Sequence, residues 1–294
     1  MLGGLLIIWS LTIMSSKWSI KYSFIFFAVV FISCSFGNKT IKIKGSDTEV
    51  NLAVQLAESF HQINPEIFVS ISGGGSGLGI ASLLNGTADL ANSSRSINTE
   101  EIKLFLNKGI HIDSFIFAQD AIAFVVAESL PIDSINTKDL AAILKGDFSN
   151  WFELTGKKLP VNIYGRQSNS GTHDFIKKRL GIDFSSHAKE MNGNAQILEA
   201  IKSDNSGIGY VGAGYVLHGG SRGIKVLSIY TGKNSLAISP LDAAMIHKGK
   251  YFFQRPLFQY YKEESYERIK PIIDFENSDP GRKIIQAAGY YPVK

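Results

Sequence analysis

Three short segments rich in serine, threonine and glycine have the composition of an anion-binding site. They are Gly45-Ser-Asp-Thr48, Gly75-Ser-Gly77 and Ser170-Gly-Thr172, and each follows a strand-like run and precedes a helix-like run. The start of a helix offers unpaired backbone N–H groups and the positive end of the helix dipole, both of which favour anions. Hydroxyl groups add further donors, and glycine lets the backbone approach closely. Three such helix starts, brought together, would enclose a tetrahedral oxyanion.

Arg166 strengthens this interpretation, because it lies four residues before Ser170 at the end of a predicted strand. Its planar guanidinium could bind the same oxyanion through charge-assisted hydrogen bonds. Each loop alone is more typical of an ordinary helix cap or turn. The run Gly73–Gly79 lacks the Lys-Ser/Thr ending of a nucleotide phosphate loop, and it matches a dinucleotide fingerprint only loosely. The combination of loops and arginine therefore favours a free oxyanion as the ligand.

Strands and helices that alternate along the chain must position these segments, and this alternation predicts an α/β protein. The apolar run Asp120–Val126 indicates a strand buried on both faces. Ser46 and Glu49 are expected to form a capping box, and Thr99 is expected to cap a later helix. Strands are expected at 40–43, 68–71, 89–91, 120–126, 161–164, 207–211 and 255–261. Helices are expected to end near 65, 85 and 181. A further helix is expected to begin at 99, and another to span 269–275.

Length and composition fit an ordered protein with two lobes. The 294 residues exceed one ordinary domain and fit two lobes of roughly 120 residues each. Hydrophobic residues make up 45% of the chain and charged residues 19%, so a core can be buried. The formal net charge of +4 is small and no basic stripe is present. Nucleic acid is therefore not an expected partner.

The first 36 residues have the plan of an export signal. Lys17 and Lys21 precede the apolar run 24–32, which is short for a membrane span of about 20 residues. One hypothesis is that translation starts at Met14, which would leave this signal intact. The alternative to a cleaved signal is an uncleaved signal anchor. Cys34, the only cysteine, is placed like the lipid-attachment cysteine of bacterial lipoproteins, although the bulky Phe31 departs from that motif. Acyl burial of about 0.8 kcal/mol per CH₂ would then anchor the protein to a membrane.

Four segments in order resemble the PstS family of phosphate-binding proteins, over residues 40–294. They are 45–48, 73–77, Ala88-Asp-Leu-Ala-Asn-Ser-Ser-Arg95 and Gly165-Arg-x-x-x-Ser-Gly-Thr172, and the last is the most specific. Segments 207–211 and 255–257 are also similar to the family.

The resemblance implies a type II periplasmic-binding-protein fold, with the anion in a cleft between two α/β lobes. One lobe would comprise 40–118 and 239–294 and the other 119–238, with crossing strands between them. Closure of the lobes would present the bound phosphate to the permease of an ABC-type importer in the inner membrane. The implied ligands are Ser46, Asp47 through its backbone, Thr48 and Ser76 from the first lobe, and Arg166, Ser170, Gly171 through its backbone and Thr172 from the second.

Ser94 is also an expected ligand, but it departs from the best-known branch of the family. That branch has an aspartate here, which accepts the proton of phosphate and excludes sulfate. A hydroxyl can accept this proton but does not repel a fully ionised anion, so the residues imply oxyanion binding without the usual exclusion of sulfate. Arg95 either adds charge to the anion or pairs with a carboxylate across the cleft. The Asp47 side chain is expected to turn away from the anion.

Other functions remain as alternatives. The closest is a receptor for another tetrahedral oxyanion, such as sulfate or molybdate, and a surface adhesin that reuses the fold is a further one. An enzyme is not expected, because no Gly-x-Ser-x-Gly motif stands before a helix as in a hydrolase. Neither a cofactor nor a metal is expected, since His111 and His173 each lack a second ligand at a useful spacing.

Overall fold

The computed structural model describes residues 39–218 and 222–293. The expected export signal, 1–36, and the candidate lipidation residue Cys34 lie outside these described residues. Within them, no helix combines the length and the apolar character needed to cross a membrane.

A mixed sheet forms the centre of the fold, which confirms the α/β class. Its strands are ordered β2-β1-β3-β11-β4-β8-β6-β7, with β9 and β12 paired to β4, and a separate parallel pair joins β5 to β10. The strands are β1 (Lys39–Gly45), β2 (Ile67–Ser72), β3 (Leu90–Ser93), β4 (Ile112–Ala127), β5 (Ser134–Asn136), β6 (Asn162–Arg166), β7 (Lys189–Met191), β8 (Gly207–Gly212), β9 (Ile224–Val226), β10 (Ser228–Tyr230), β11 (Gln254–Lys262) and β12 (Tyr291–Pro292).

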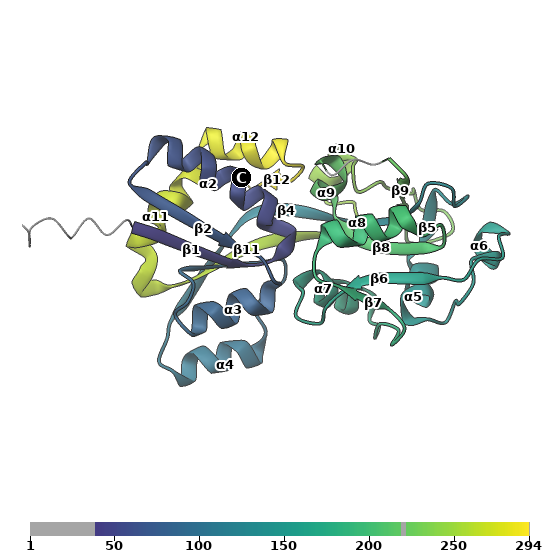
Figure 1. The fold of residues 1–294 in the computed structure, drawn as a ribbon, viewed down its shortest axis with the longest axis horizontal. Coiled ribbons are helices and arrows are strands. Elements are labelled where there is room, and N and C mark those ends of the chain that lie inside the picture. Colours follow the sequence, from purple (N-terminus) through teal and green to yellow (C-terminus); the bar gives the residue numbers. More distant parts are fainter. Residues whose placement is uncertain (1–38, 219–221, 294) are drawn as a thin grey trace, which may run out of the picture. The chain divides into compact units, whose positions relative to one another are not determined.

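Helices follow most of the strands. In Figure 1, α2 and α12 lie with β1 and β2 at one end of β4, and α7 and α8 lie with β6 and β8 at the other. The helices are η1 (Asp47–Glu49), α2 (Val50–Ile63), α3 (Ser76–Leu84), α4 (Thr99–Asn107), α5 (Thr137–Lys145), α6 (Phe152–Thr155), α7 (Gly171–Leu180), α8 (Asn194–Ser203), α9 (Ala213–His218), α10 (Ala243–His247), η2 (Glu263–Ser265), α11 (Tyr266–Asn277) and α12 (Asp279–Ala287).

Two large hydrophobic clusters divide the described chain into what we call a first half and a second half. The main cluster of the first half draws on 41–118 and 257–290, and that of the second half on 121–253. Strand β4 belongs to both, because its beginning pairs with β11 and its end with β8. Ile246, Tyr251 and Phe253 pack in the second half. The division into lobes stays a prediction, and these three residues favour a boundary near Gln254 rather than at 238.

Two expected helix caps are wrong. Ser46 makes no capping hydrogen bond, and its hydroxyl donates instead to Ser94 Oγ at 3.0 Å. The cap of α4 is Asn98 rather than Thr99: its side chain accepts from the Glu101 N–H at 2.8 Å, and Glu101 accepts from the Asn98 N–H at 2.9 Å. A capping motif is predicted from local spacing alone. This spacing does not indicate that the serine hydroxyl hydrogen-bonds to a residue distant in the sequence.

Strand β4 begins at Ile112, earlier than the expected 120. Its first residues are partly exposed and its last eight are buried. Only the buried part has the continuous apolar run that identifies a strand covered on both faces.

Candidate functional site

The predicted residues of the first half meet at one edge of the sheet. Ser46 and Thr48 follow β1, Ser94 follows β3, and β1 and β3 are parallel neighbours, so their carboxyl ends lie together. Ser76 is the first residue of α3. All four side chains are at most 3% exposed. The sequence thus places three hydroxyl groups where two neighbouring strands end, and the hydroxyl of Ser76 at a helix start beside them.

The three serines of this edge hydrogen-bond to one another. Ser46 Oγ donates to Ser94 Oγ at 3.0 Å, and the Ser94 backbone N–H donates to Ser76 Oγ at 3.1 Å. Gly171 of the second half lies directly against this group. A Cβ atom at Gly171 would clash with Ser76 Oγ and would lie 2.6 Å from Ser94 Oγ. Glycine is therefore required here by close approach to the serines.

The second half contributes Arg166, at the end of β6, and the first turn of α7. Ser170 caps this helix, since its Oγ accepts from the Thr172 N–H at 3.2 Å and lies 3.5 Å from the His173 N–H. Thr172 Oγ1 lies 3.1 Å from Thr48 Oγ1. The two halves also meet where Gly77 N–H donates to the Asn169 carbonyl at 3.0 Å. Residues from both halves, as expected from the sequence, therefore converge.

Arg255 is a residue that the sequence analysis did not place in the site. Its Nη2 donates to Thr48 Oγ1 at 3.2 Å and to Thr172 Oγ1 at 3.1 Å, and it pairs with Asp120 at 2.8 Å. The Arg255 and Asp120 side chains are fully buried. The two residues face each other across β11 and β4. In the sequence, Arg255 stands out only as part of a segment similar to the PstS family, because strand register cannot be read from one sequence.

Asp47 does not point into the serine group. Its carboxylate pairs with Arg166 Nη1 at 3.2 Å and accepts from the Asn194 backbone at 2.8 Å and side chain at 2.6 Å. Arg166 Nη2 also donates to the Asn192 carbonyl at 2.9 Å. Among the described residues, Arg166 Nε has no hydrogen-bond partner. The Asp47 side chain thus joins the two halves beside the predicted anion site.

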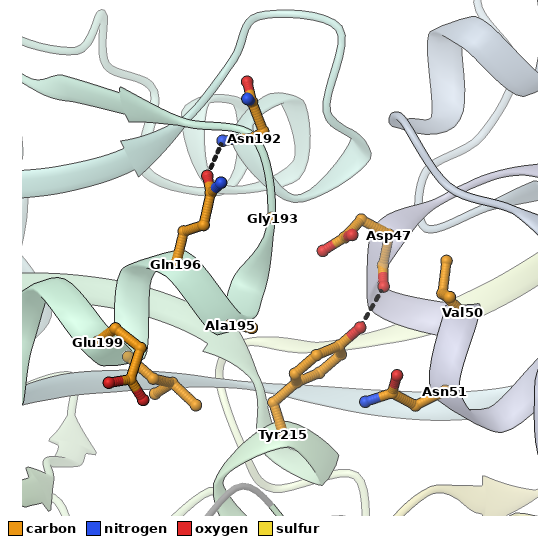
Figure 2. A pocket seen from close by; sticks show the side chains of 10 residues that line it. Asp47, Val50, Asn51, Asn192, Gly193, Ala195, Gln196, Glu199 and Tyr215 are labelled. Atoms are coloured by element: carbon orange, nitrogen blue, oxygen red, sulfur yellow. Dashed lines mark hydrogen bonds between the residues drawn. The ribbon is translucent and has the colours of Figure 1, made fainter.

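A pocket of 450 Å³ adjoins Asp47 (Figure 2). Figure 2 shows Tyr215, whose hydroxyl donates to the Asp47 carbonyl at 2.7 Å, and Gln196, which accepts from the Asn192 N–H at 2.9 Å. The other lining residues include Asn51 and Glu199. The pocket is therefore lined by Asp47 and Tyr215, which hydrogen-bond to each other.

Arg95 forms an ion pair, but not across the cleft. Its guanidinium donates to both carboxylate oxygens of Glu101, at 2.8 and 2.6 Å. Glu101 lies on α4, in the same half. Arg95 thus pairs with a carboxylate, as one of its two expected roles requires. The expected location of that carboxylate, across the cleft, is wrong. The reason is local: Glu101 already points back toward Asn98 in the capping box.

Burial controls the charges around the site. It lowers the pKa of Arg166, with Asp47 opposing the change, and raises that of Asp120, with Arg255 opposing. Burial also raises the pKa of Glu49 well above its usual value, against the effects of the Ser46 hydroxyl and Arg255. The two arginines at the site each have a carboxylate partner: Arg166 pairs with Asp47, and Arg255 pairs with Asp120. Hydroxyl groups and two compensated guanidiniums suit a small oxyanion, which needs several directed donors.

The buried Glu276 of α11 is expected to make the fold less stable as the pH rises. Burial raises the pKa of its carboxyl from 4.5 to about 8, although the Gln259 side chain, which donates to it at 3.2 Å, opposes this. Between these values the folded protein holds a proton that the unfolded chain releases. The free energy of unfolding therefore falls by up to about 1.4 kcal/mol per pH unit in this window.

The Glu276→Gln variant tests this, because glutamine cannot titrate and can still accept from Gln259. Urea denaturation should show it more stable than the wild type near the upper end of the window, with the difference shrinking toward pH 4.5. Equal pH slopes in the two proteins would contradict the expectation.

The model of the family described as "PBP superfamily domain" matches residues 35–275. The phosphate-binding protein PstS of Borreliella burgdorferi is 27% identical over 272 residues, which cover 87% of this chain and 91% of that protein. PstS of Pseudomonas aeruginosa PAO1 is 27% identical, over 85% of this chain and 81% of its own length. The resemblance to the PstS family is confirmed.

Solved structures show the same fold. A putative phosphate ABC transporter substrate-binding protein with bound phosphate from Clostridium perfringens is 23% identical with a TM-score of 0.77, and the match covers 87% of this chain and all of that one. An ABC-type phosphate transport receptor from Vibrio cholerae is 25% identical with a TM-score of 0.68, over 86% of this chain and all of the other. The expected type II periplasmic-binding-protein fold is confirmed.

Proposed function

Because the chain belongs to the PBP superfamily, we propose that it binds inorganic phosphate between its two halves and delivers it to the permease of an ABC-type importer. The observation that carries the proposal is the meeting of Thr48 and Thr172 from opposite halves, 3.1 Å apart and beside a guanidinium. The names of the relatives, phosphate-binding proteins and phosphate transport receptors, support the choice of anion.

The ligands of the anion are drawn from both halves. The hydrogen-bond donors lie in both halves, so the anion can accept from all of them only when the halves are together. Anion binding and closure of the halves are therefore one event. The Asp47–Arg166 pair and the Tyr215–Asp47 hydrogen bond support a closed arrangement of this kind. The proposed set is Ser46, Asp47 through its backbone, Thr48, Ser76, Ser94, Arg166, Ser170, Gly171 through its backbone and Thr172.

The protein would act outside the cytoplasm as a receptor and not as an enzyme. Residues 1–36 would direct export, and Cys34 would carry the lipid that holds the receptor at the membrane. Loss of the Cys34→Ala variant from the membrane fraction checks the anchor. Sustained hydrolysis of a chromogenic phosphate monoester by the purified protein would contradict a pure receptor role.

Thermal unfolding with phosphate and with sulfate tests the proposal. A ligand that binds only the folded state stabilises it by mass action. Phosphate should raise the melting temperature much more than equal concentrations of sulfate. A larger shift with sulfate would overturn the choice of phosphate and favour a receptor for another oxyanion, which Ser94 in place of a carboxylate would permit. No shift with any oxyanion would contradict the proposed class of ligand.

A further inference from the structure

We propose that Arg255 is a positioning residue that makes the hydroxyl groups of Thr48 and Thr172 donors toward the bound anion. The inference rests on the proposed function, in that both threonines are taken as ligands. It adds a role for a charged residue that touches both halves without itself being one of the expected ligands.

The hydrogen bonds of the guanidinium are nearly all assigned by its neighbours. Nε and Nη2 both donate to Asp120 Oδ2, at 2.9 and 2.8 Å, and Nη1 donates to the Ser94 carbonyl at 3.2 Å. Nη2 therefore has one N–H left for the two threonine hydroxyls, which lie 3.2 and 3.1 Å away. A guanidinium has only donors, so neither hydroxyl can donate to it.

The direction of the two hydroxyl protons follows from this arrangement. Each hydroxyl has one proton and two lone pairs, and a lone pair of each faces Arg255. The protons of Thr48 and Thr172 must then point to the other threonine or to the anion. A bound oxyanion accepts from both, and each hydrogen bond is strengthened because the oxygen that donates it also accepts from a charged group.

Arg255 is held firmly enough to impose this direction. Its side chain and that of Asp120 are fully buried, and the Phe175 ring lies 5.7 Å from its guanidinium carbon. Thr48 is fixed in turn, because its carbonyl accepts from the Tyr290 hydroxyl at 2.5 Å. Asp120 neutralises the arginine, so its contribution to the site is direction more than net charge.

A double-mutant cycle tests the proposal. Removing one member of a buried ion pair is strongly destabilising, whereas removing both can be nearly neutral, so the background is the double variant Asp120→Asn/Arg255→Met. Phosphate affinity is measured by calorimetry for Thr172→Val in the wild type and in that background. Ser76→Ala is the matched control, because Ser76 bonds to Ser94 and not to the guanidinium.

Thr172→Val should weaken phosphate binding at least about tenfold in the wild type and less than about threefold in the background, since the hydroxyl there is no longer held as a donor. Ser76→Ala should cost the same factor in both. Equal costs of Thr172→Val in the two proteins would overturn the proposal. Should the background variant not fold, as judged by circular dichroism, Asp120→Asn/Arg255→Gln replaces it: the glutamine amide oxygen can accept from a threonine hydroxyl, so the direction of the hydroxyl is no longer imposed, and an unchanged Thr172→Val cost there would also overturn the proposal.

A failure of the proposed function is distinguishable from a failure of this inference. If the wild type binds sulfate in place of phosphate, the proposed function fails, but the same cycle measured with sulfate still decides the role of Arg255.

Discussion

Gly171→Ala is expected to lower phosphate affinity by about thirtyfold, because overpacking at a tight contact costs about 2 kcal/mol. The added methyl group would clash with Ser76 and crowd Ser94, both of which belong to the other half. Gly171 is the first residue of α7, where alanine is the better helix former. The melting temperature of the free protein should therefore stay the same or rise slightly. Isothermal calorimetry and thermal unfolding of the same preparation check both parts.

Gly232→Ala is the matched control. The nearest described atom to a Cβ there is Ser235 Oγ at 3.5 Å, an ordinary contact, so phosphate affinity should not change. If the Gly171→Ala variant bound phosphate as tightly as the wild type, the start of α7 would not pack against Ser76 and Ser94 when phosphate binds. A large fall in melting temperature of the free Gly171→Ala protein would also contradict the account.

Arg166→Ala is expected to lower phosphate affinity by at least about thirtyfold, since truncating one partner of a buried charged pair costs about 2 kcal/mol or more. The change removes a nearly buried guanidinium, and it leaves the Asp47 carboxylate beside the site without its cation. Both effects disfavour an anion. Equilibrium binding of radiolabelled phosphate to wild type and variant measures the loss.

Arg179→Ala provides the control for a lost arginine. This guanidinium lies over the Phe252 ring and donates to the Phe252 carbonyl, within the second half. Its removal should leave phosphate affinity within about twofold, as is usual for surface substitutions. A loss under about threefold in Arg166→Ala would remove Arg166 from the proposed ligand set, because a charged hydrogen bond at a buried site is worth more.

The parts of the site that follow from local chemistry could be predicted from the sequence. Ser46 and Ser94 come directly after two runs with strand character, and parallel strands place such residues at one edge. The Ser170-Gly-Thr172 loop carries its own helix-capping signal, and Arg166 is near it in the chain. These residues could be found because each depends on neighbours only a few positions away.

The parts that depend on long-range pairing could not be predicted. Arg255 and Asp120 are 135 residues apart and meet because β11 pairs with β4 in one register. The Asp47–Arg166 contact likewise joins residues 119 apart. Neither pair leaves a signal in a single sequence. The same limit explains why local spacing predicts Ser46 as a helix cap although its hydroxyl donates to Ser94.

The central claim is that phosphate is held where the two halves meet, and a crystal structure grown with phosphate tests it most directly. The anion is expected within hydrogen-bonding distance of Arg166, Thr172 and Ser94. The Thr48 and Thr172 hydroxyls are expected to donate to the anion while they accept from Arg255. Phosphate bound instead in the pocket beside Tyr215, with the two threonines still bonded to each other, would contradict the account.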